Sequence, residues 1–206
     1  MLRHVKWTLS LALIALALFA VAPEARAQTP EGTVITNTAT ATYTDANGNA
    51  YAPVSGSVSV TVGFKAGVTV TANTPSPASA SPSTADTMTF TVANVGNGTD
   101  SMTISEGISV AGVITVTGYR FGATTYGTLA ALNGALATVG IAQGGSIVIK
   151  VVFDVASGKG GITTVYTVTS TSRRTPATSG NAFSTITPIT VYGVAVSPDG
   201  GQNVNE

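Results

Sequence analysis

The feature that most constrains this chain is an alternation of apolar residues with threonine or serine, which returns in short runs along most of its length. Side chains of an extended strand point alternately to its two faces, so each run can bury one face and keep the other in water. Threonine is β-branched and favours such a pleated, half-buried surface. The alternation therefore predicts an all-β protein made of antiparallel strands.

The first pair of alternating runs lies in residues 32–62, GTVITNTATATYTDANGNAYAPVSGSVSVTV, on either side of a turn at residues 45–49. The period of two places Ile35, Ala39, Ala41 and Tyr43 on one face of the first run and Val58, Val60 and Val62 on one face of the second. An isolated hairpin is at best marginally stable in water. We therefore expect this hairpin to dock on the following domain or on another chain.

The turn at residues 45–49, Asp-Ala-Asn-Gly-Asn, consists of residues that tolerate positive φ and bond to their own backbone. Its oxygen atoms could also suggest a calcium ion, but the spaced ligand loop with a closing glutamate is missing. A hairpin turn without a metal is the preferred interpretation.

Further along the chain, alternation predicts strands over residues 67–72, 86–92, 99–105, 111–117, 146–155, 163–170 and 183–191. The strand at 146–155 is the most apolar, and the centre of the core is expected to contain Ile147, Ile149, Val151, Phe153 and Val155. The β pattern lapses over residues 119–137. There, leucines at helical spacing after Thr128, a possible N-cap, predict a short helix over residues 129–137 at one end of the sandwich.

Three short polar segments could have a specific role, and each also has an ordinary explanation. Asn97-Gly98-Thr99 matches a glycosylation acceptor triplet, although a turn explains these residues without a sugar. Arg173-Arg174 would suit a protease, although such residues are ordinarily exposed turn residues. Lys150 and Asp154 lie four residues apart on one face of a strand, and are expected to form a solvated pair of little energetic value.

The N-terminus has the pattern of a cleaved secretory signal peptide over residues 1–27. Basic residues precede an apolar run at residues 9–21, and Ala25-Arg26-Ala27 is the motif that a signal peptidase recognises. The run is too short for a transmembrane helix, which needs roughly 20 apolar residues. A retained N-terminal anchor is the alternative. We expect an exported mature chain, residues 28–206, that does not insert into the membrane.

Removal of residues 1–27 would also remove the single histidine and the single tryptophan. The mature chain has no cysteine, and its 6 basic and 8 acidic side chains give a net charge of 6 − 8 = −2. This charge offers no footprint for nucleic acid. Acid-base, nucleophilic and metal chemistry usually need His, Cys or clustered carboxylates. We therefore expect no catalytic, cofactor or metal site, although a carboxylate pair from distant loops stays open.

Three segments resemble a known family: residues 36–45, TNTATATYTD, residues 90–98, FTVANVGNG, and residues 193–201, GVAVSPDGG. They look like the conserved repeat domain of unknown function that occurs in tandem in large bacterial surface proteins. The resemblance implies an immunoglobulin-like antiparallel β-sandwich and a place at the cell surface. It supplies no catalytic residues. This chain departs from the family in being short and in stopping where a further repeat would begin.

Together these observations predict an N-terminal hairpin and joint at residues 28–66, an immunoglobulin-like sandwich at 67–191, and a strand-like tail at 192–206 that could begin a truncated further repeat. The expected function is that of a secreted or cell-surface structural or adhesive module without catalysis. The alternatives are a filament or surface-layer subunit joined by strand addition, and a carbohydrate-binding module. Partners would be other surface proteins or copies of the chain. The candidate association surface comprises Ile35, Tyr43, Val58, Val60, Val194 and Val196.

Overall fold

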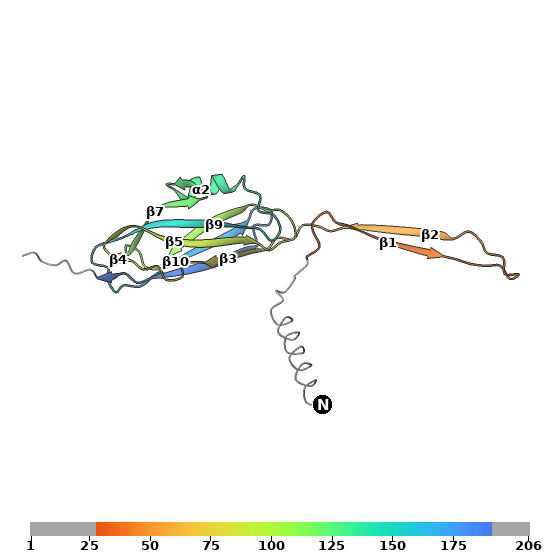
Figure 1. The fold of residues 1–206 in the computed structure, drawn as a ribbon, viewed down its shortest axis with the longest axis horizontal. Helices are drawn as coiled ribbons and strands as arrows, with labels where there is room; N and C mark the ends of the chain where they lie inside the picture. Colours follow the sequence, from red (N-terminus) through yellow and green to blue (C-terminus); the bar gives the residue numbers. More distant parts are fainter. Residues whose placement is uncertain (1–27, 191–206) are drawn as a thin grey trace, which may run out of the picture.

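A computed structural model describes residues 28–190 of the chain. The predicted signal peptide and the predicted tail, with Val194 and Val196, lie outside the described residues. Figure 1 shows two parts, a β-sandwich and a long hairpin that extends away from one end of it. The described chain ends at Thr190, at the opposite end of the sandwich from the hairpin (Figure 1).

The larger sheet of the sandwich has five strands in the order β3-β5-β9-β7-β8, and every neighbouring pair is antiparallel. Its strands are β3 (Val68–Ala72), β5 (Ser83–Asn94), β7 (Ile114–Phe121), β8 (Thr124–Tyr126) and β9 (Ser146–Val155). The smaller sheet has the antiparallel order β11-β10-β6. Its strands are β6 (Met102–Ile108), β10 (Thr164–Ser172) and β11 (Ser179–Ile186). Two short strands, β4 (Ala80–Ser81) and β12 (Ile189–Thr190), pair in parallel.

The strand order identifies the fold class. Named from A to G along the chain, strands β3, β5, β9 and β7 are A, B, E and D of one sheet, and β6, β10 and β11 are C, F and G of the other. This ABED and CFG arrangement is that of the constant-type immunoglobulin sandwich. The prediction of an immunoglobulin-like antiparallel β-sandwich with an extra hairpin and a short helix is confirmed.

The core lies between the two sheets, and the residues that alternation placed inside β5 and β9 are buried there, except Ile147, which is half-buried at the edge of the core. Met88, Phe90 and Val92 of β5 are fully buried, and so are Ile149, Val151 and Phe153 of β9. The ring centroids of Phe90 and Tyr166 lie 6.0 Å apart, which joins the larger sheet to the smaller one. The alternation in the sequence therefore predicted which face of these strands is buried.

The predicted helix is α2 (Leu129–Leu136), and it begins as expected, because the Thr128 side chain accepts a bond from the Ala131 amide at 3.2 Å. Leu132 and Leu136 are buried. Asn133 also bonds to the free edge of β6: its Oδ1 accepts from the Ile104 amide at 2.7 Å, and its Nδ2 donates to the Ile104 carbonyl at 2.8 Å. The helix therefore covers part of a sheet edge that would otherwise be open.

The prediction that the β pattern lapses from residue 119 is wrong up to residue 126. Strand β7 continues to Phe121, and β8 turns back along it. The pairing of β7 with β9 shifts register between Val116 and Gly118. Such a bulge adds one residue to a strand and so interrupts its alternation. The strand predicted at 111–117 begins three residues later than expected, at Ile114, and the one predicted at 99–105 begins at Met102.

The expected pair between Lys150 and Asp154 is also wrong. Oδ1 of Asp154 accepts a hydrogen bond from the Ala85 amide at 2.8 Å, at the point where β5 shifts register against β9. Within residues 28–190 the structure shows an ion pair elsewhere, between Glu31 and Arg174.

Candidate association surface

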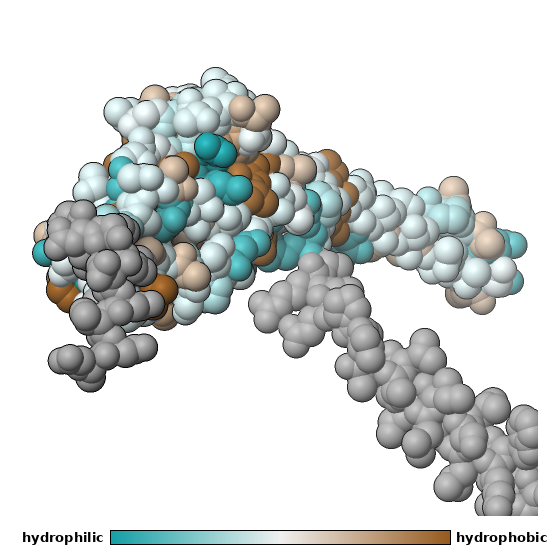
Figure 2. All heavy atoms as spheres, turned by 60° about the vertical axis from the view of Figure 1, so that its left-hand side comes forward, coloured by the Kyte–Doolittle hydropathy of each residue, from teal (hydrophilic) through white to brown (hydrophobic). Residues whose placement is uncertain are grey.

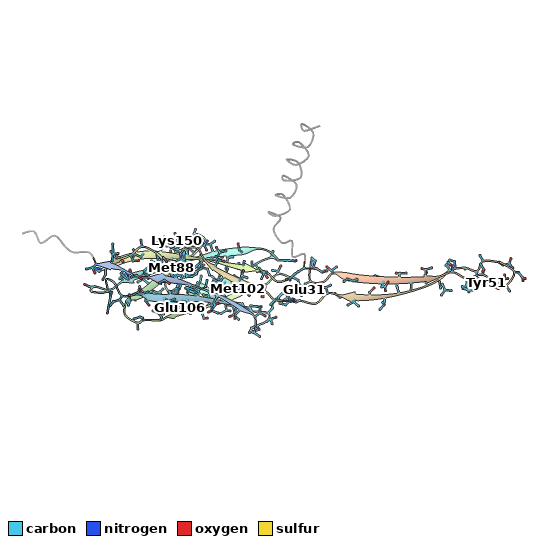
Figure 3. The ribbon with its side chains drawn as sticks, turned by 90° about the horizontal axis from the view of Figure 1, so that it is seen from below. Glu31, Tyr51, Met88, Met102, Glu106 and Lys150 are labelled. Carbon is cyan, nitrogen blue, oxygen red and sulfur yellow. The ribbon has the colours of Figure 1, made fainter. Side chains whose placement is uncertain are left out.

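The N-terminal hairpin consists of β1 (Val34–Ala41) and β2 (Val54–Thr61), which pair antiparallel along their full length. We call residues 33–62 the arm. Bonds from the Gly32 amide to the Val62 carbonyl and from the Val62 amide to the Thr33 carbonyl, both 2.9 Å, close its base. Figure 3 labels Glu31 where the arm meets the sandwich and Tyr51 near the distal tip.

The two faces of the arm differ in polarity. Residues directly opposite each other in an antiparallel pair share a face. One face has hydroxyl pairs, Thr36 with Ser59 at 2.8 Å and Thr40 with Ser55 at 2.9 Å. The other, which we call the apolar face, comprises Ile35, Asn37, Ala39, Ala41, Val54, Gly56, Val58 and Val60. The predicted surface residues Ile35, Val58 and Val60 are therefore brought together on one face.

Every residue of β1 and β2 is exposed, including Ile35 at 56%, Val58 at 63% and Val60 at 64%. The expectation that the arm docks on the following domain is therefore wrong, because the arm points away from the sandwich (Figure 1). Neither strand contains a charged residue. Figure 2 shows weakly polar, pale surface along the arm, with hydrophilic atoms at its tip. The arm thus presents an uncharged apolar face and two open strand edges.

The tip of the arm is closed by aromatic stacking and by the predicted turn. Tyr43 and Tyr51 stack with ring centroids 5.0 Å apart. Oδ1 of Asp45 accepts from the amides of Asn47 and Asn49 at 2.9 and 2.8 Å, and Oδ2 accepts from Asn49 Nδ2 at 2.8 Å. These bonds, first that from the Asn49 side chain, hold the pKa of Asp45 below its ordinary value. The prediction of a turn at residues 45–49 is confirmed.

The arm is joined to the sandwich through Asn97, in the loop between β5 and β6. Asn97 is 5% exposed, and its side chain makes three bonds: Oδ1 accepts from the Lys65 amide at 2.7 Å, and Nδ2 donates to the carbonyls of Gly63 and Thr29 at 2.9 and 3.2 Å. Its carbonyl accepts from the Glu31 amide at 2.8 Å. Asn97 therefore binds the two chain segments that flank the arm, one before it and one after it. Buried and fully bonded, it supports the turn interpretation of the acceptor triplet.

An ion pair fixes the other side of the joint. The Arg174 guanidinium binds Glu31 through both nitrogens, at 2.5 and 2.6 Å, and lies 3.6 Å from the ring centroid of Phe64. The bond to Arg174 holds the pKa of Glu31 below its ordinary value. Arg173 donates to the carbonyls of Met102 and Asn133 at 3.1 and 2.8 Å. Both arginines are exposed residues of a loop, as predicted, and they also bond to neighbouring segments of the chain.

Two more buried polar residues stiffen the same loop. Asn94 donates to the carbonyls of Gly98 and Ile141 at 2.8 and 2.7 Å, and Asp100 accepts from the Ser172 hydroxyl at 2.5 Å. Sequence reasoning missed these roles, having assigned the segment as a turn from its composition. The available signal was the spacing of Asn94, Asn97 and Asp100 at intervals of three in a loop next to a buried strand.

The edges of the sandwich are better protected than those of the arm. β3 and β11 approach so closely that a Cβ added at Gly180 would lie 2.7 Å from the Val68 carbonyl oxygen. On the other side α2 covers β6, and the edge strand β8 has three residues. Short or covered edges do not readily pair with other strands. Among the described residues, the arm therefore has the least protected edges.

Other features of the surface offer little specific chemistry. A hollow of about 420 Å³ is lined by Thr103, Ser105, Thr171, Ser172, Arg173 and Pro176. Most of these side chains carry a hydroxyl, and Arg173 is the charged member of the set. Residues 28–190 contain no cluster of three or more His, Cys, Asp or Glu side chains suited to a metal ion. They also contain no helix with the length and apolar character needed to cross a membrane.

The carboxylate of Glu106, near the C-terminal end of β6, binds the hydroxyls of Tyr119 and Tyr166 and so connects the two sheets. Oε2 of Glu106 accepts from the hydroxyl of Tyr119 at 2.7 Å and from that of Tyr166. Both tyrosines are buried, whereas Glu106 is exposed. Burial, and then the bond to Glu106, raise the pKa of both hydroxyls above the ordinary tyrosine value. The cluster reads as a structural bridge between β6, β7 and β10.

This cluster predicts alkaline destabilisation. The tyrosine pKa is higher in the folded chain than in the unfolded chain, where it is about 10. The stabilising contribution is thus complete below that pH and falls as the pH rises above it. We expect the urea midpoint to decrease between about pH 9 and pH 11. The double variant Tyr119→Phe with Tyr166→Phe should be less stable at neutral pH but decline less over this interval. An equal decline would contradict the assignment.

No family model and no curated protein match this chain. One solved structure with a similar arrangement is described as the ASH / PapD-like domain of human CEP192, PapD-like domain 7. The similarity has a TM-score of 0.37 and 9% sequence identity, and covers 61% of this chain and 86% of that one. The assignment of the immunoglobulin-like class rests on the strand order described above.

Proposed function

We propose that this chain is an exported structural or adhesive module of the cell surface, in which the arm is the element that binds partners. The observation that supports the proposal is an uncharged, apolar, exposed face that extends away from the sandwich, with Asn97 and Arg174 bonding to the segments at its base. Exposed apolar faces of this kind usually mark interaction sites. The partners would be copies of the chain or other surface proteins.

Export is proposed from the sequence pattern of residues 1–27. Without disulfides, an extracellular fold depends on its core and on buried polar networks such as that around Asn94 and Asn97. The catalytic chemistry expected to be missing also fits a structural role. Fractionation of a tagged chain would test this: a full-length protein that keeps residues 1–27 and stays in the cytoplasm would contradict export.

The association role can be tested by measuring the mass in solution of residues 28–206 at several concentrations. We expect mass to rise with concentration, and Ile35→Asp with Val60→Asp to suppress the rise, because a charge on the apolar face would have to be desolvated. The matched control is Thr36→Asp with Ser59→Asp, on the opposite face of the same strands. If the chain stays monomeric at all concentrations and captures no surface partner, the proposed role of the arm is wrong.

A second candidate function is a filament or surface-layer subunit joined by strand addition. The observation in its favour is that the described chain ends at the pole of the sandwich opposite to the arm, with 16 residues, 191–206, still to follow (Figure 1). A strand from those residues could add to an open edge of the next copy's arm. Deletion of residues 192–206 should then abolish polymers seen by light scattering, and polymers that survive the deletion would rule this mode out.

A further inference from the structure

Gln28 is the first residue after the signal-peptidase motif at residues 25–27, and its backbone is held against the sandwich. The Gln28 carbonyl accepts a hydrogen bond from Gln143 Nε2 at 3.0 Å. Three residues further on, the Glu31 amide donates to the Asn97 carbonyl at 2.8 Å. Cleavage at the motif would therefore create a new N-terminus that is bonded to the sandwich from its first residue.

The side chain of Gln28 is not held in the same way. Gln28 is half-buried, and its side-chain oxygen, Oε1, is buried without a hydrogen-bond partner. A buried acceptor without a partner costs free energy and does not hold its side chain in place. The backbone of Gln28 is thus anchored, whereas the carbonyl of its side chain can change position without the loss of a hydrogen bond.

We propose that Gln28 is a modification site: once residues 1–27 are removed, the side chain of Gln28 cyclises onto its own α-amine, and the mature chain begins with pyroglutamate. This proposal rests on the proposed export of the chain, because cleavage creates the α-amine. The reaction takes place within one residue and uses no co-reactant.

The reaction exchanges one carbon–nitrogen bond for another. The unprotonated α-amine of Gln28 attacks Cδ of the side-chain amide, and a bond forms between this nitrogen and Cδ. The bond from Cδ to Nε2 breaks, and Nε2 leaves as ammonia with the proton that the amine gives up. The product is a five-membered lactam with one N–H and with Oε1 as its carbonyl oxygen. The ordinary pKa of an α-amine lies within about one unit of pH 7, so part of it is the neutral nucleophile.

The charges at the joint favour the neutral lactam over a free ammonium. A half-buried ammonium loses part of its hydration and needs a carboxylate partner. The nearest acidic residue along the chain is Glu31, whose two oxygens already bind the two nitrogens of Arg174, at 2.5 and 2.6 Å. Arg174 also brings a positive charge to this region, and like charges disfavour each other. Cyclisation of Gln28 removes the ammonium charge.

The lactam is compatible with the anchored backbone. The carbonyl of residue 28 is not part of the ring, so it can keep its bond from Gln143. An aminopeptidase recognises a free α-amine, and a chain that begins with a lactam has none. The segment that leads into the base of the arm, with Glu31, would thus resist degradation from its N-terminal end.

Mass spectrometry of the exported protein tests the proposal. The full-length chain is produced in a secreting host, purified and kept at neutral pH. The tryptic peptide of residues 28–65 is then fragmented. We expect most molecules to have a mass lower by one ammonia than that of unmodified residues 28–65, with the loss located at residue 28. Fragmentation is needed because Asn47-Gly48, in the same peptide, can also lose ammonia.

Gln28→Asn is the matched control. It keeps the side-chain amide, but its shorter side chain would have to close a four-membered ring, so residue 28 should keep its full mass and a free amine. An equal loss at residue 28 in this variant would overturn the proposal. A Gln28 amine that stays free, or a cleaved chain that begins at another residue, would also overturn it while export stands. A chain that keeps residues 1–27 would contradict both the modification and export.

Discussion

Replacement of Asn97 by alanine is expected to lower the free energy of unfolding by about 2–4 kcal/mol. The side chain makes three hydrogen bonds to backbone groups in the segments that flank the arm, and the residue is almost fully buried. Its removal takes away all three bonds, and a typical hydrogen bond contributes about 0.5–1.5 kcal/mol net. Urea unfolding followed by circular dichroism would measure the change.

Asn181→Ala is the control for this variant, since Asn181 is an exposed asparagine on β11. It should change stability by less than about 0.5 kcal/mol. Asn97→Ala should also widen the distribution of distances between a spin label on the arm and one on the sandwich, because the joint loses its fixed geometry. If Asn97→Ala is as stable as Asn181→Ala and the distance distribution stays narrow, Asn97 is not the residue that holds the arm.

The elements of the sandwich that the sequence predicted well are those whose structure depends on a single local pattern, such as alternation in a strand or leucine spacing in a helix. Strand β5 alternates from Met88 to Asn94, and β9 has its largest buried side chain, Phe153, on the face that alternation placed inside, with no bulge between the two strands over this part. The helix follows from leucine spacing and from Thr128 at its N-cap. Each of these signals lies within about ten residues of sequence, where periodicity alone is informative.

The joint could not be predicted in the same way, because its partners are far apart in the sequence. Asn97 bonds to groups near residues 29 and 63–65, and Arg174 reaches Glu31 across 143 positions. A loop composition rich in Asn and Gly is compatible with any turn. Only the fold reveals that these residues meet at one end of the sandwich and hold the arm.

The sequence pattern of the exposed arm matches that of a hairpin whose one face is buried in the sandwich. Residues 32–62 and 161–191 are offset by 191 − 62 = 129 positions, so Ile35, Asn37 and Ala39 correspond to Thr164, Tyr166 and Val168 of β10. Those three residues are buried against the larger sheet. In the arm the equivalent face has no opposing sheet among residues 28–190. This is why alternation predicted burial of one face there, although the arm is exposed.

Replacement of Glu106 by alanine is expected to lower the free energy of unfolding by about 2–3 kcal/mol. The carboxylate accepts from two tyrosine hydroxyls, and hydrogen bonds to a charged group are worth about 1.5–3 kcal/mol each. The exposure of Glu106 reduces this value, because water can replace part of the contact. Glu106→Gln retains an acceptor oxygen and should cost less.

The variant Tyr166→Phe distinguishes the contribution of the hydrogen bond to Glu106 from that of the packing of the Tyr166 ring. It removes one hydroxyl from a buried ring and should cost about 1–2 kcal/mol. If Tyr166 acts through Glu106, the combined variant Glu106→Ala with Tyr166→Phe should lose less than the two single losses added together, with a coupling of at least about 0.5 kcal/mol. Strict additivity would mean that the carboxylate and the hydroxyl stabilise the sandwich independently. The two sheets would then be held together across this end by apolar packing, with Phe90 against the Tyr166 ring as its nearest aromatic contact.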